Sequence, residues 1–136
     1  MLKGLERLQA VAEIDDLVQR YGDYVDMGDI DGFVNSFAPD GVFGTIAGHA
    51  ALRAHREKGS GGIVRRHIFT PPIIAFTSAT TASGRGFCLV IERHPDGRED
   101  PYYCVDYKDA YRKTDKGWKL QHRQVPRSFS SSSRTG

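Results

Sequence analysis

Asp26 and His67 are the two side chains whose types and positions best fit proton transfer. Asp26 ends a helical apolar repeat and lies on the border of the apolar stripe, not on its solvent side. A carboxylate on that border either caps the backbone near Asp29 or takes part in acid–base chemistry, and the sequence leaves both open. We predict that it supports His67 at the bottom of an apolar pocket.

His67 lies in a strand-like run, where the two-residue period places it on one face with Arg65 and Phe69. A histidine in such a strand is a packed or surface residue unless its face meets the end of the first helix. If the two do meet, an aspartate bound to one ring nitrogen fixes the tautomer and leaves the other nitrogen as a proton acceptor. His67 is then the proton carrier.

Tyr21 is the third candidate, five residues before Asp26. That spacing corresponds to about 140° of rotation on an ideal helix, so we expect a shared pocket only if the chain leaves helical geometry near Asp26. Met27 and Gly28 make such a departure possible. Tyr21 fits a core position as well as a catalytic one.

The elements that position these residues begin with helices. Apolar residues at three- and four-residue steps predict a long amphipathic helix over 5–26. Gly28 can supply the left-handed residue that ends it, and Asp29 is a candidate N-cap for a second, short helix. We expect a turn at 39–41, a strand over 42–46 and a third helix over 49–58.

Beyond Gly62 the pattern changes to strands, over 64–76, 80–93, 102–113 and 118–125. Pro71-Pro72 predicts that the first of these is an edge strand or is broken there. Helices followed by an antiparallel meander predict an α+β domain whose helices cover one face of a strongly curved sheet and leave a cavity. We expect this domain to span 1–127, followed by a serine-rich flexible tail over 128–136.

Composition excludes several classes of function. The net charge of +2 is spread without a basic stripe, which argues against nucleic acid. The longest apolar run, Phe87 to Ile91, is too short for a membrane span, and without a secretory signal we expect a cytoplasmic protein. The histidines lack metal-ligand spacing, nucleotide-binding motifs are missing, and Cys88 and Cys104 fit free thiols. We therefore predict no metal and no cofactor.

Several segments resemble SnoaL-like proteins of the NTF2-like superfamily. They are Ile14 to Tyr21, Asp26 to Asp31, Phe37 to Asp40, Arg66-His67 and the final hairpin Tyr111 to Leu120. The resemblance implies a cystatin-like cone. Within the superfamily the pattern is most similar to scytalone dehydratase, bile-acid 7α-dehydratase and hexachlorocyclohexane dehydrochlorinase, which use an Asp-supported His as base.

Asp26 and His67 match that dyad by position. Tyr21 matches a tyrosine of the bile-acid enzyme, and Arg123 matches an arginine of the dehydrochlorinase. Tyr102 falls where scytalone dehydratase has a second histidine, although Tyr103 occupies the opposite face of the same strand and the period alone does not choose between the faces.

The resemblance implies that His67 removes a proton beside a carbonyl and that water is then lost. Tyr21, Tyr102 or Arg123 would stabilise the enolate. A small hydrophobic polyketide, steroid or aromatic substrate is expected to lie against an apolar wall of Phe43, Phe69, Phe87 and Tyr102, with Phe37 beside them. The alternatives are a non-catalytic ligand-binding or dimerisation module and a polyketide cyclase. We expect a homo-oligomer, a trimer or a dimer, that covers the outer face of the sheet.

Overall fold

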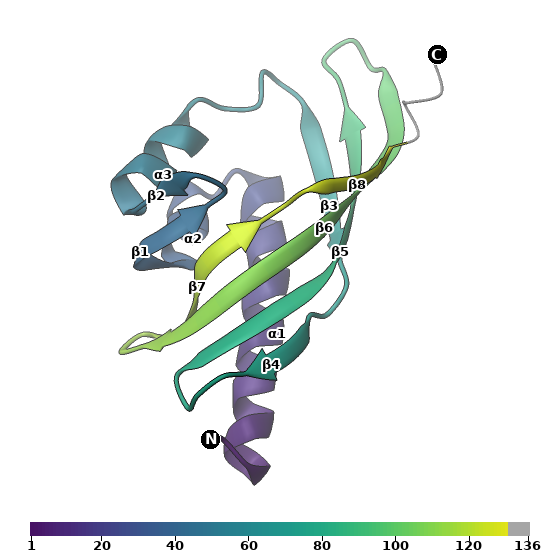
Figure 1. Ribbon diagram of the computed structural model, residues 1–136. Coiled ribbons are helices and arrows are strands. Elements are labelled where there is room, and N and C mark those ends of the chain that lie inside the picture. Colours follow the sequence, from purple (N-terminus) through teal and green to yellow (C-terminus); the bar gives the residue numbers. More distant parts are fainter. Residues whose placement is uncertain (131–136) are drawn as a thin grey trace.

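The computed structural model describes residues 1–130, apart from the side chains of residues 100–102 and 130. Helices lie against one side of a long, curled sheet, and α1 runs along its concave side (Figure 1). The helices are α1 (Gly4–Met27), α2 (Ile30–Asn35) and α3 (His49–Glu57). The strands are β1 (Phe37–Phe43), β2 (Ile46–Ala47), β3 (Val64–Phe69), β4 (Ile73–Phe76), β5 (Thr81–Arg93), β6 (Glu99–Thr114), β7 (Gly117–Gln124) and β8 (Arg127–Ser130).

The end of α1 matches its sequence signals. Gly28 adopts φ 70°, and its amide donates to the carbonyls of Tyr24 and Val25. The next residue, Asp29, accepts a 2.9 Å hydrogen bond from the backbone amide of Gly32 and so caps α2. Because α1 continues to Met27, Asp26 lies on its last turn and projects toward the sheet.

The sheet has the order β2-β1-β7-β6-β5-β3, with β4 paired to β5 and β8 paired to β6. Every pair is antiparallel except β1 and β7, which run parallel, so the sheet is mixed and not the pure antiparallel meander expected. The turn predicted at 39–41 falls instead within β1, in the stretch between Phe37 and Val42 where the register with β7 shifts and the chain forms an irregularity of the strand.

The structure confirms the break predicted near Pro71-Pro72 but differs from the prediction at the C-terminal end of the sheet. Strand β3 stops at Phe69 and β4 starts at Ile73, so the chain breaks at Pro71-Pro72 as their missing amide donors require. Residues 127–130 form β8 against β6, so residues 128–130, which the sequence assigned to a flexible tail, are paired in the sheet. The rest of that tail, 131–136, lies outside the described residues.

A charged pair is buried in the centre of the core. Arg123 is 0% exposed, and its Nε and Nη2 donate to the two carboxylate oxygens of Asp109 at 2.8 and 2.6 Å. Tyr111 adds a 2.6 Å hydrogen bond to the same carboxylate. Burial opposes the charge of Arg123, but attraction to Asp109 outweighs it, so the pKa of Arg123 lies above its ordinary value.

The Asp109→Asn variant tests this pair. An amide of nearly the same shape leaves the Arg123 cation buried without a counter-charge, which we expect to cost about 3–5 kcal/mol of unfolding free energy in urea titrations. The matched control is Asp16→Asn, which breaks an exposed ion pair with Arg20 and should cost at most about 0.5 kcal/mol. Similar losses for the two variants would contradict this assignment.

Candidate active site

Asp26 and His67 meet between the last turn of α1 and the edge strand β3. Asp26 Oδ1 lies 2.5 Å from His67 Nδ1, and Oδ2 accepts the backbone amide of His67 at 3.0 Å. The histidine side chain is 16% exposed and the aspartate side chain 10%. Of the two possibilities left open by the sequence, Asp26 contacts the strand histidine, whereas Asp29 caps the helix.

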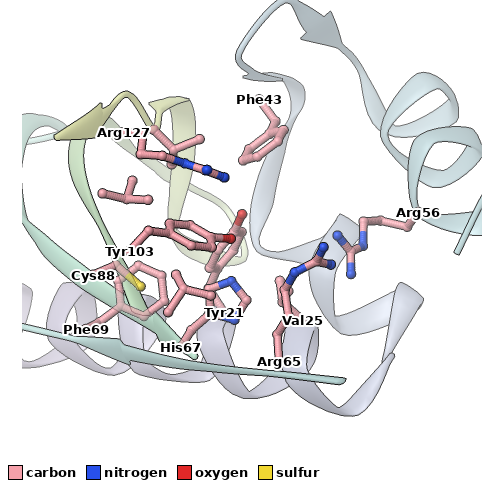
Figure 2. A pocket seen from close by; sticks show the side chains of 13 residues that line it. Tyr21, Val25, Phe43, Arg56, Arg65, His67, Phe69, Cys88, Tyr103 and Arg127 are labelled. Atoms are coloured by element: carbon pink, nitrogen blue, oxygen red, sulfur yellow. The ribbon is translucent and has the colours of Figure 1, made fainter. Parts of the chain in front are cut away.

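The geometry fixes how the imidazole can act. A carboxylate oxygen accepts hydrogen bonds, so Nδ1 carries the proton and Nε2 is left free to accept one. Figure 2 shows the His67 ring projecting among the side chains that line a cavity. Phe69 holds the ring from one side in a nearly parallel stack, with 6.2 Å between ring centroids and 16° between ring planes.

The cavity in front of His67 has a volume of about 240 Å³. Its walls come from α1, α3 and from β1, β3, β5 and β6, with the chain after β7 closing one side. The lining residues are Tyr21, Val25, Phe43, Arg56, Arg65, His67, Phe69, Cys88, Val90, Tyr103, Val105, Val125 and Arg127. A space of this size, lined mostly by aromatic and aliphatic side chains together with His67 and three arginines, suits a small and largely apolar guest.

Tyr21 shares the cavity with His67 although α1 remains helical through Met27. A departure from helical geometry was the condition for Tyr21 and Asp26 to share a pocket; the helix stays regular, and Tyr21 lines the cavity while Asp26 contacts His67 without being part of the lining. Burial raises the pKa of Tyr21 to about 12. Its hydroxyl therefore stays protonated near neutral pH and can donate a hydrogen bond.

Two predicted substrate contacts need correction. Phe87 is 50% exposed on the outer face of β5, because its neighbour Cys88 takes the inward position in the two-residue alternation. Arg123 is fully buried and lies behind the cavity wall, with its guanidinium carbon 4.3 Å from the ring centroid of Tyr21 and 5.2 Å from that of Phe69. It supports both rings by cation–π contact and does not reach a guest.

Phe43 and Phe69 line the cavity as expected, whereas the side chain of Tyr102 lies outside the described residues. Sequence reasoning missed Tyr103, which takes the inward face of β6. The two-residue period placed Tyr103 opposite Tyr102, but alternation alone did not show which of the two faces is inward. Of the missed arginines, Arg65 shares the face of His67 by the two-residue period, whereas Arg56 and Arg127 carried no comparable signal.

Apart from His67, the described residues offer neither a reactive thiol at the cavity nor a group of metal ligands. Burial raises the pKa of the Cys88 thiol to about 12, so it is not a nucleophile near neutral pH. Within residues 1–130, no three His, Cys, Asp or Glu side chains are grouped in a way that could hold a metal ion. In the same part of the chain, no helix is long and apolar enough to cross a membrane.

Comparisons with known proteins agree with this architecture. The sequence model of the SnoaL-like domain matches residues 6–124. No curated protein matches the chain. A solved structure of a candidate scytalone dehydratase from Novosphingobium aromaticivorans is similar, with a TM-score of 0.83, 22% identity and coverage of 93% of this chain and 89% of that one.

Two further solved structures are similar. Rv3472 of Mycobacterium tuberculosis, described as a protein of unknown function, has a TM-score of 0.81 and 23% identity over 96% of this chain and 79% of that one. A Novosphingobium aromaticivorans protein described as NTF2-like with a cystatin-like fold has a TM-score of 0.79 and 24% identity over 96% and 90%. At these identities the likeness shows the fold, which is the expected NTF2-like cone.

The Asp26→Asn variant tests the hydrogen bond that orients His67. In the wild type, nitrogen–proton correlation spectra should show neutral His67 with its proton on Nδ1. In the variant, the new amide NH₂ can donate to Nδ1, so we expect a substantial shift toward the Nε2-protonated form. His49, whose Nε2 lies 2.8 Å from the carbonyl oxygen of Phe37, is an internal control that should not change. A wild-type His67 protonated on Nε2 would contradict the geometry.

Proposed function

The chain belongs to the SnoaL-like domain family, and from this premise and the site geometry we propose that it is a cofactor-independent lyase of the dehydratase type, or an isomerase. Its substrate is a small hydrophobic molecule of polyketide, steroid or aromatic character. The observation that carries the proposal is the 2.5 Å contact of Asp26 with His67 Nδ1, which leaves Nε2 as the one imidazole nitrogen available to the cavity.

In the proposed reaction, His67 Nε2 takes a proton from the carbon beside a carbonyl, and the Asp26 carboxylate balances the imidazolium that forms. The electron pair of the broken C–H bond forms an enolate, which the neutral Tyr21 hydroxyl stabilises by hydrogen bonding. A hydroxide on the next carbon then leaves with the proton held by His67, giving water and a carbon–carbon double bond. An isomerase would return that proton to another carbon.

Turnover of a panel of aromatic and polycyclic β-hydroxy ketones tests this proposal, because their dehydration gives enones that absorb in the near ultraviolet. We expect His67→Ala to lower kcat by about 10²–10⁴, the usual contribution of a placed base. Asp26→Asn should reduce kcat because the ring loses its orientation. The control His122→Ala removes a histidine outside the cavity and should retain activity. Equal turnover in the wild type and both dyad variants would refute the dyad.

The two alternatives predict different products. A ligand-binding module would bind the same molecules without changing them, and His67→Ala would bind as well as the wild type. A polyketide cyclase would use the same pair on a carbon acid, but ring closure without loss of water leaves the mass of the substrate unchanged. Mass spectrometry of the reaction mixture therefore separates dehydration, which removes one water, from cyclisation.

We also propose that the chain assembles as a dimer or trimer through the outer face of the sheet. Strands β3, β4 and β5 expose an unusual run of large apolar side chains there, namely Val64, Ile68, Ile73, Phe87, Leu89 and Ile91. An exposed apolar patch of this kind is usually covered by another protein surface.

The cytoplasmic location remains a prediction from the sequence.

Analytical ultracentrifugation tests the assembly. We expect Ile68→Lys to shift the protein toward monomer, because a buried lysine in the interface would lose its hydration without a partner. Leu8→Lys is the matched control, since Leu8 is also exposed, at 63%, but lies on α1. A monomeric wild type would contradict the proposal, as would an Ile68→Lys variant that assembles normally.

A further inference from the structure

The charge of the cavity is one-sided. Its thirteen lining residues include Arg56, Arg65 and Arg127 together with His67, and none is Asp or Glu. Arg123, behind two of the aromatic rings, is neutralised by Asp109 and adds no net charge. Arg65 pairs with Glu92 and Arg127 lies over the Tyr103 ring, but the three guanidinium groups still make the lining positive, which favours a guest with a negative charge.

Arg56 and Arg65 differ from Arg127 because they border two cavities. Both also line a second cavity of about 640 Å³, formed by the end of α1, α3 and the loop after it, so the two arginines stand where the cavities join. The close-up view shows their side chains at the same end of the cavity, on the side of Val25 (Figure 2). A group bound there would have its apolar part free to extend toward Phe69.

Arg56 has its charge available for a ligand. Its guanidinium carbon lies 5.1 Å from the ring centroid of Phe33, which holds the group in place without neutralising it. No carboxylate of the residues that the structure describes forms an ion pair with it. Arg65 is paired with Glu92 through Nε at 3.0 Å, which orients its guanidinium. Two acids, Asp26 and Glu57, line the second cavity, and Asp26 is bound to His67.

We propose that the substrate carries an anionic group, a carboxylate or a phosphate, which Arg56 and Arg65 bind at the junction of the two cavities. The apolar part of the molecule then lies between Phe69 and Val90, with its reacting carbon near His67. Planar guanidinium groups match the oxygens of both anions and hold them by charge-assisted hydrogen bonds. This inference rests on the proposed function for the reacting carbon, but the anion site can be tested by binding alone.

Calorimetric titration with three probes of similar shape tests the anion site: 2-naphthoate, 2-naphthyl phosphate and the neutral 2-naphthamide. For the wild type we expect at least one anion to bind about tenfold or more tighter than the amide, since a charged hydrogen bond commonly gives a factor of that order. Whichever anion binds tighter identifies the carboxylate or the phosphate as the favoured group. The preference should shrink at 1 M NaCl, because salt screens partly exposed charges.

Arg56→Gln and Arg65→Gln should each remove most of the preference. The matched control is Arg53→Gln, which makes the same change in charge on the same helix at a residue paired with Asp31 and absent from the cavity lining. His67→Ala should keep the preference, so a protein without turnover can still show the anion site. Equal affinities for all three probes in the wild type, no binding of any probe, or full preference in both cavity variants would overturn the proposal.

Discussion

The Asp26 carboxylate contacts both the backbone and the ring of a histidine 41 residues away in the chain. One oxygen accepts the His67 amide, which fixes the edge strand β3 against the end of α1, and the other accepts the ring, which fixes its tautomer. Asp26 lies on the last turn of α1, which ends at Gly28 with its positive φ. One carboxylate therefore sets both the position of the strand that carries the base and the orientation of its ring.

The second constraint is the charged pair behind the cavity. Asp109 accepts two hydrogen bonds from Arg123, whereas Nη1 has no hydrogen-bond partner and the flat cation is packed against Tyr21, Phe69 and Tyr107. Two of those rings form the cavity wall, so the ion pair stiffens the surface on which a guest would lie.

The parts predicted from sequence are those set by neighbours in the chain. The end of α1 at Gly28, the cap at Asp29 and the break at Pro71-Pro72 follow from local backbone chemistry. The inward side of a strand does not, because alternation marks two faces without saying which one meets the core. Phe87 was assigned to the wrong face for this reason, and the burial of Arg123 could not be foreseen without knowing that β6 brings Asp109 beside it.

The protonation states in the cavity restrict how the proposed elimination can proceed. Tyr21 and Cys88 both have pKa values raised to about 12 by burial, and burial also raises the pKa of Tyr103, so these groups are weaker acids than usual. Arginine does not give up its proton in proteins. Among the lining residues, His67 is then the one group whose ring nitrogen can accept a proton from the substrate and later return it. A single imidazole can serve both steps only if the departing hydroxide lies on the same face of the substrate as the proton it removes.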